Sequence, residues 1–162
     1  MTRRATAAAP VPAPSAANGW VLDASVTLPW FFPDEVSPFT EGLLDALGAQ
    51  PIWVPALWVL ECTNVLHSAQ RRGRIDADRR AEIVGQLGAL PVRVDHEPLT
   101  FATIDRLAAV HGLSAYDAAY LELALRRSLT LVSLDAQLLG AAQRLGHPVL
   151  TADPPSSAPL LS

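Results

Sequence analysis

The chain of 162 residues carries a net charge of −4, and 50% of its residues are hydrophobic, which is enough apolar material for the core of one domain. The negative charge excludes a positive field over the whole protein, although basic residues could still gather on one face. There is no lysine, which excludes Schiff-base chemistry and lysine-dependent phosphate loops. The single cysteine, Cys62, excludes an internal disulfide and a cysteine-only metal site, and it fits a cytoplasmic protein.

Stretches rich in alanine and proline stand at both ends of the chain. Residues 1–18 and 151–162 have the composition of flexible tails, so one folded domain is expected over residues 19–150. The first stretch has no continuous apolar run, which argues against a secretory signal. No apolar run reaches the length of a membrane-spanning helix, so no membrane partner is expected.

Strand and helix patterns alternate between residues 20 and 150. Short apolar or alternating runs predict five strands, at residues 20–22, 52–54, 92–95, 129–132 and 148–150. Helices are predicted from Pro38 towards Gly48, over about 56–72, after Asp76 or Asp78, over 98–110, from Ser114 to Arg127 and from Asp135 towards Gly146. A proline-bracketed aromatic segment at residues 28–33 predicts a loop or a short helical turn. This alternation predicts an α/β domain of three layers, with a central, mainly parallel sheet of about five strands and helices on both faces.

Apolar positions on the helices predict which side chains face the core. The helix over residues 56–72 is apolar nearly all round at its start, so that half is expected to be buried. Leu44, Val84 and Phe101 belong to apolar stripes and are expected to face inward. The aromatic residues around Trp30 and Trp53 exceed what a small domain easily buries, which indicates a surface for a second copy of the chain or another partner.

Four carboxylates stand next to the predicted strands and helix starts. Asp23 and Asp135 each follow a strand, and both suit a turn or an N-cap. Asp117 matches a capping box with Ser114. Glu61 interrupts the apolar half of its helix, where an ion needs a partner, a cavity or a metal, unless it belongs to a solvated stripe. Each carboxylate therefore has a local explanation as well as a functional one.

The joint position of these four carboxylates favours the functional explanation. Strand ends and the helix starts that follow them share one edge of a parallel sheet, where ligands bind. Asp117 joins the others only if its helix also starts at that edge. Crowded carboxylates repel unless they are neutralised or a cation intervenes, and oxygen ligands suit Mg²⁺ or Mn²⁺ better than Zn²⁺. Such a cation activates water and clamps phosphoryl oxygens.

Four segments of the sequence, in this order, resemble the PIN domain family and, more narrowly, its VapC-like ribonuclease toxins. They are residues 21–25 (VLDAS), Leu60-Glu61 with Asn64, residues 114–121 (SAYDAAYL) and residues 131–138 (LVSLDAQL). Each segment is weak alone, but the ordered set is fairly specific and spans roughly residues 20–150. The long Ala/Pro stretch before the first strand departs from the family pattern, and the absence of lysine leaves RNA contacts to arginine.

The resemblance implies an endonuclease that hydrolyses RNA with Mg²⁺ (or Mn²⁺) and leaves 5′-phosphate and 3′-hydroxyl ends. It further implies the toxin of a type II toxin–antitoxin pair, with RNA as substrate and a small antitoxin as partner; the surplus of aromatic residues is what suggests a homodimer. Asp23, Asp117 and Asp135 would hold the metal directly or through water. Glu61 would bind a second metal or a water and help to orient the nucleophile.

Three polar residues would support the acids through hydrogen bonds, and three arginines would contact RNA. The supporting residues are Ser25, Ser133 and, with a weaker claim, Asn64. Arg71, Arg72 and Arg74 form the densest basic cluster and are the candidates for phosphate contacts at the rim of the site. A solvated helix end, where arginine favours the C-terminal dipole, explains these arginines equally well.

Other classes of protein fit the sequence less well. Asp23-x-Ser25 resembles the opening motif of haloacid dehalogenases, but the second acid of that motif and its lysine are missing. A receiver domain fails on the same missing lysine. The stronger alternative is a catalytically silent PIN-like module that binds protein or RNA, against which the intact set of four acids argues.

Overall fold

The computed structural model describes residues 19–152, so the tails predicted at residues 1–18 and 151–162 lie almost wholly outside the described residues. Five parallel strands form one sheet in the order β3-β2-β1-β4-β5. The strands are β1 (Trp20–Leu22), β2 (Ile52–Pro55), β3 (Val92–Asp95), β4 (Thr130–Val132) and β5 (Val149–Leu150). The central strand β1 is buried at every position, as a strand covered on both faces requires. The predicted α/β class and parallel sheet are confirmed.

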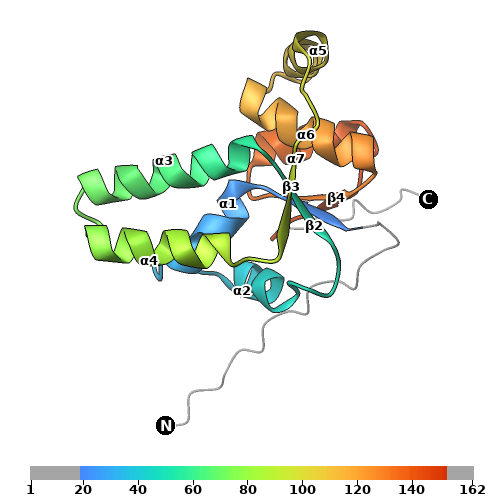
Figure 1. Ribbon diagram of the computed structural model, residues 1–162. Coiled ribbons are helices and arrows are strands. Elements are labelled where there is room, and N and C mark those ends of the chain that lie inside the picture. Colours follow the sequence, from blue (N-terminus) through green and yellow to red (C-terminus); the bar gives the residue numbers. More distant parts are fainter. Residues whose placement is uncertain (1–18, 153–162) are drawn as a thin grey trace.

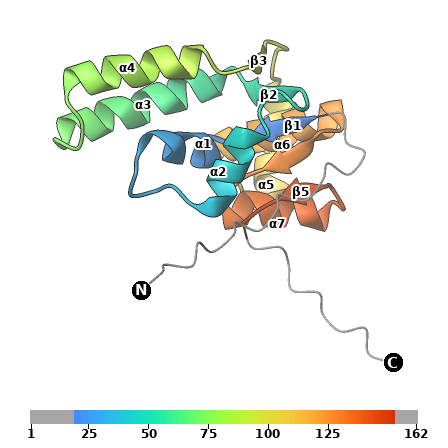
Figure 2. The ribbon, with the colours of Figure 1, turned by 90° about the horizontal axis from the view of Figure 1, so that it is seen from below.

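Helices cover both faces of the sheet (Figures 1 and 2). They are α1 (Ala24–Thr27), the 3₁₀ turn η1 (Leu28–Phe31), α2 (Pro38–Asp45), α3 (Leu57–Arg71), α4 (Ala77–Gly88), α5 (Phe101–His111), α6 (Ala115–Arg127) and α7 (Ala136–Arg144). The chain moves from β1 to β3 in one direction and then to β4 and β5 in the other, so right-handed crossovers put α1–α4 on one face and α5–α7 on the opposite face. Helix α6 packs against β1, β2 and β4, and α3 and α4 lie side by side as a hairpin.

Short-range hydrogen bonds fix the helix starts where the sequence predicts them. Ser37 and Thr40 form a reciprocal capping box at α2, with Pro38 at its first position. Asp76, rather than Asp78, caps α4 by accepting a hydrogen bond from the backbone N–H of Arg79 at 2.7 Å. These caps need only neighbouring residues, which is why the sequence predicts them.

Several burial predictions are wrong. The first turn of α3 exposes Leu60, whose relative accessibility is 67%, and Phe101 at the start of α5 is 98% exposed. Leu44 and Val84 also face solvent, because only one side of α2 and of α4 meets the core. Most of the aromatic residues pack into the domain: Phe31, Phe32 and Trp58 are buried, and Trp30 and Trp53 are partly buried against the core.

No helix within residues 19–152 combines the length and the apolar character needed to span a membrane.

Candidate active site

Asp23 is the most buried of the four predicted acids. It follows β1 directly, in extended conformation at the N-cap of α1, and its relative accessibility is 7%. Its Oδ2 accepts two hydrogen bonds of 2.7 Å, one from the hydroxyl of Ser25 and one from that of Ser133. Ser133 follows β4, the strand next to β1, so the sheet order itself delivers its hydroxyl to this carboxylate. Both predicted supporting serines therefore contact Asp23.

Glu61 lies one turn into α3 and contacts helix α6. Its Oε2 accepts a hydrogen bond of 2.5 Å from the hydroxyl of Tyr120. Tyr120 stands one turn after Asp117 and is completely buried. Since Tyr120 reaches Glu61, the start of α6 lies at the same edge of the sheet as the start of α3. The condition for Asp117 to join the other acids is therefore met.

Asp117 and Asp135 both take part in helix caps. The hydroxyl of Ser114 accepts a hydrogen bond from the backbone N–H of Asp117 at 3.0 Å and donates to its Oδ2 at 2.6 Å. Asp135 caps α7, because its Oδ1 accepts a hydrogen bond from the backbone N–H of Leu138 at 2.8 Å. The local and functional explanations are thus compatible, since the second oxygen of each carboxylate accepts no hydrogen bond within residues 19–152.

A hydrogen-bond chain links Asp135 to the buried centre. The backbone N–H of Asp135 donates to the Ser133 hydroxyl at 2.9 Å, and that hydroxyl in turn donates to Asp23. The backbone N–H of Leu134 donates to the Ser25 hydroxyl at 3.0 Å. The segment after β4 is therefore held against the segment after β1 by both serines, which fixes the distance between two of the acids.

Mutual repulsion and burial perturb the carboxylates. Burial raises the pKa of Asp23, and the charge of Asp117 adds to the rise, while the hydroxyls of Ser25 and Ser133 oppose it. Burial also raises the pKa of Glu61, with contributions from Asp23 and Asp117, and the Tyr120 hydroxyl opposes that rise. Three acids from three different elements thus act on one another, as the sequence predicts for crowded carboxylates.

The donor set fits a hard divalent cation by its chemistry. The acids offer carboxylate oxygens, and a cation would offset both the burial of the Asp23 charge and its smaller repulsion by Asp117, which together raise the pKa of Asp23. Within residues 19–152 no three His, Cys, Asp or Glu side chains are arranged as a ready metal-binding group.

Two further residues stand next to Glu61 on α3. Asn64 is exposed and makes no hydrogen bond to any acid within residues 19–152, so the structure does not bring it into the cluster. Cys62 is buried, and burial, with the charges of Glu61 and Asp23, raises the pKa of its thiol to about 12. A thiol of that kind is unreactive and has no place in the chemistry.

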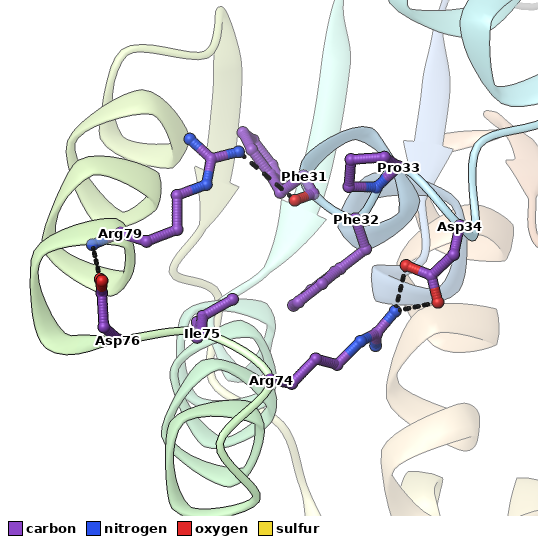
Figure 3. A pocket seen from close by; sticks show the side chains of 8 residues that line it. All are labelled: Phe31, Phe32, Pro33, Asp34, Arg74, Ile75, Asp76 and Arg79. Atoms are coloured by element: carbon purple, nitrogen blue, oxygen red, sulfur yellow. Dashed lines mark hydrogen bonds and ion pairs between the residues drawn. The ribbon is translucent and has the colours of Figure 1, made fainter.

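The three predicted RNA-contacting arginines differ in their surroundings. Arg74 forms ion pairs of 2.6 Å with both Asp34 and Glu35, and its guanidinium lies 4.2 Å from the centre of the Phe32 ring. It belongs to the wall of an open cavity of about 370 Å³ between η1 and the turn after α3 (Figure 3). Arg71 and Arg72 are exposed, and no ion pair holds either of them within residues 19–152. Arg74 is therefore already neutralised, which leaves Arg71 and Arg72 as the better candidates.

A second buried carboxylate, Asp95 at the end of β3, serves a different purpose. It forms ion pairs with two arginines at the end of α6, with Arg126 at 2.5 Å and with Arg127 at 2.6 Å. The guanidinium carbon of Arg127 also lies 3.8 Å from the centre of the Trp53 ring. Burial acts to raise the pKa of Asp95, but the two arginines outweigh it and the pKa is lowered. This cluster anchors the far end of α6 to the sheet.

Tyr120 is the one site residue that sequence reasoning did not single out. Its signal was present, because a tyrosine in a wholly apolar stretch needs a partner for its hydroxyl. Its spacing of three from Asp117 puts it on the same side of α6, but the partner Glu61 becomes visible only once α3 and α6 are placed together.

A PIN domain model matches residues 20–153, so the chain belongs to the PIN domain family. Ribonuclease VapC3 of Pyrobaculum aerophilum is 34% identical over 122 residues, which cover 73% of this chain and 90% of that protein.

Two solved structures share the fold. The crystal structure of FitAcB from Neisseria gonorrhoeae superimposes with a TM-score of 0.61 at 20% identity, over 81% of this chain and 96% of that one. The crystal structure of PAE2754 from Pyrobaculum aerophilum gives a TM-score of 0.54 at 23% identity, over 81% of this chain and 82% of that one.

Proposed function

We propose that this protein is an endoribonuclease that depends on Mg²⁺ or Mn²⁺ and acts as the toxin of a toxin–antitoxin pair. The observation that carries the proposal is the buried carboxylate of Asp23, held by Ser25 and Ser133 and repelled by the charge of Asp117. A buried carboxylate close to other carboxylates costs folding free energy, and a bound cation would offset that cost, so the arrangement supports a cation site. The 34% identity to a protein named as a ribonuclease supports RNA as the substrate class.

Each acid has a stated role in this proposal. Asp23, Asp117 and Asp135 would hold the cation directly or through water, and Glu61 would bind a second cation or a water and orient the nucleophile. The bound cation would supply a hydroxide at neutral pH and offset negative charge on the phosphoryl oxygens. The phosphodiester would be cleaved to leave 5′-phosphate and 3′-hydroxyl ends.

The chain's own residues prepare this site in three ways. Ser25 and Ser133 orient one oxygen of Asp23 and leave the other without a side-chain hydrogen bond. Tyr120 keeps Glu61 turned towards the start of α6 by donating to its Oε2. Ser114 fixes the carboxylate of Asp117 at the first turn of that helix.

The test incubates the full-length chain with a structured RNA in Mg²⁺ or Mn²⁺ and then in EDTA. The matched pair of variants is Asp23→Asn and Asp45→Asn, since Asp45 is an exposed carboxylate at the end of α2, before the loop that enters β2. We expect cleavage by the parent protein and by Asp45→Asn, loss of cleavage in EDTA, and loss of cleavage in Asp23→Asn. Cleavage that survives EDTA or survives Asp23→Asn would refute the metal mechanism.

The partner part of the proposal is tested separately. A small protein encoded next to this chain, co-expressed with it, should co-purify with it and suppress the cleavage. If the chain cleaves no RNA and no divalent cation stabilises it, the silent binding module of the sequence analysis is the better description.

A further inference from the structure

Exposed apolar side chains stand beside the acids of the candidate site. Leu60 directly precedes Glu61, Tyr116 directly precedes Asp117, and Leu134 directly precedes Asp135. Their relative accessibilities are 67%, 64% and 40%. Three of the four acids therefore each have an exposed apolar neighbour in the chain.

Tyr116 is the one flat aromatic ring among these neighbours, and the geometry of α6 places it at the mouth of the site. Residues four apart lie on the same face of a helix, so Tyr116 and Tyr120 share a face. Tyr120 is buried and reaches Glu61 on α3. One turn nearer the helix start, Tyr116 continues that face into solvent, next to Asp117.

The way α3 and α6 face each other supports this placement. Leu57 on α3 lines a cavity of about 140 Å³ together with Ala119 and Leu123 on α6, and one turn further along α3, Glu61 meets Tyr120. Helices α3 and α6 therefore face each other along this stretch, and the charge of Asp117 at the start of α6 acts on Glu61. Tyr116 directly precedes Asp117 in the exposed first turn of α6.

Nothing in the described fold accounts for the exposed ring. The Tyr116 hydroxyl makes no hydrogen bond within residues 19–152, and the ring is not part of the core. With the cation of the proposed function bound at the acids, an exposed aromatic ring beside them suits a ligand that carries both an anionic group for the cation and a flat apolar face. A nucleotide has this composition, and unpaired bases stack on aromatic side chains.

We propose that Tyr116 is a base-stacking subsite for single-stranded RNA, which receives an unpaired base next to the phosphate held at the acids. The position of that phosphate rests on the proposed function, whereas the stacking itself does not require cleavage. A base in a duplex cannot reach the ring, because it is already stacked and paired, so the subsite selects single-stranded RNA.

The experiment measures RNA binding in the Asp23→Asn background, so that the proposed cleavage does not consume the probe. The probe is a fluorescently labelled single-stranded RNA of mixed sequence and about 12 nucleotides, compared with the same strand annealed to its complement. We expect Tyr116→Ala to weaken single-strand binding about tenfold or more, with no change in the unfolding temperature. Tyr116→Phe and Tyr116→Trp should retain binding, and Tyr116→Leu should lose it, because the flat ring and not the hydroxyl or the apolar character makes the contact.

Phe101→Ala is the matched control. Phe101 is an even more exposed aromatic residue at the start of α5, about 15 Å of helix axis away from the end of α5 that leads into α6. Its loss should leave binding unchanged. The subsite is refuted if Tyr116→Ala binds like the parent or no more weakly than Phe101→Ala, or if Tyr116→Phe is as weak as Tyr116→Ala. It is also refuted if duplex binding falls equally, or if neither the Asp23→Asn protein nor the chain with an intact Asp23 in Mg²⁺ shows measurable single-strand binding.

Cleavage by the chain with an intact Asp23 separates the two proposals. Tyr116-dependent binding without any cleavage would keep the subsite and refute the nuclease. Cleavage together with binding that ignores Tyr116 would keep the nuclease and refute the subsite, and would leave the exposed ring to a protein partner.

Discussion

The hydroxyl of Tyr120 donates a hydrogen bond of 2.5 Å to Oε2 of Glu61, and this bond joins α6 to α3 at the candidate site. The pKa of Tyr120 is raised by burial and by the nearby charges of Asp23 and Glu61, so the phenol stays a donor across the physiological range. The bond opposes the rise that burial imposes on the pKa of Glu61.

Tyr120→Phe should therefore affect both stability and the pH dependence of activity. We expect a loss of about 1–2 kcal/mol in the free energy of unfolding, because a hydrogen bond to a charged group is lost. The pKa of Glu61 should rise further, which moves the acidic limb of the pH–rate profile to higher pH. Denaturant unfolding and a pH series of RNA cleavage measure the two effects. Tyr116→Phe is the control for stability, and an equal loss in both variants would contradict the assignment.

Asp23→Asn should stabilise the protein at neutral pH in the absence of divalent cations. The folded-state pKa of Asp23 is raised, so its ionised form is penalised by folding above that pKa, and the penalty vanishes once the pH falls below the unfolded value of 3.8. The neutral amide avoids the penalty, and the expected gain is about 0.5–2 kcal/mol at neutral pH. Thermal unfolding in EDTA at several pH values checks this, and a gain that persists below pH 3.8 would contradict the electrostatic cause.

Divalent cations should make the parent protein more stable than Asp23→Asn, the reverse of the order expected without them. Mg²⁺ or Mn²⁺ should raise the unfolding temperature of the parent protein by binding the folded state, and should do so much less in Asp23→Asn. Asp45→Asn should respond like the parent, because its carboxylate is exposed and remote from the acids. An equal response of all three proteins would refute a cation site at Asp23.

The sequence predicted those parts of the site that depend on neighbours in the chain. The caps at Ser37 and Ser114 and the acid after β1 could be predicted, because a cap or a short buried run requires only a few adjacent residues. The contact between Glu61 and Tyr120 could not be predicted, because these residues are 59 positions apart and meet only through the packing of α3 against α6. Leu60 and Phe101 were predicted to be buried because they belong to apolar stripes of their helices. The pattern of apolar residues does not show whether another element covers a given position, and both side chains are exposed.

Asp95→Asn should destabilise the protein at neutral pH, since it removes the charge that two arginines share. We expect a loss of about 2 kcal/mol, below that of a fully buried pair because Arg126 and Arg127 are partly exposed. The pKa of Asp95 is lowered, so its contribution is complete above the unfolded value of 3.8 and is lost as the pH falls through the folded value. The difference from the parent should therefore shrink below pH 3.8 in acid unfolding experiments, and a constant difference would contradict it.

Substitutions of Arg71 and Arg74 should have different effects, one on RNA affinity and the other on the unfolding temperature. Arg74→Ala should lower the unfolding temperature, because it removes two ion pairs and the cover of the Phe32 ring, and should leave RNA affinity nearly unchanged. Arg71→Ala should leave stability unchanged and weaken RNA binding, with the slope of log K against log salt reduced by about 0.7 if one phosphate contact is lost. If instead Arg74→Ala weakened RNA binding and Arg71→Ala did not, Arg74 would be the arginine that contacts RNA.

The cap that Asp135 forms on α7 determines how this site can be lost in evolution. A change to alanine would remove an acid of the proposed nuclease and would also leave the first backbone N–H groups of α7 without their cap, so it would cost stability as well as the proposed activity. Asparagine or serine keeps the cap and removes only the charge. A silent descendant of this protein should therefore carry one of these two residues at position 135, and its sequence would still read as a well-formed helix start.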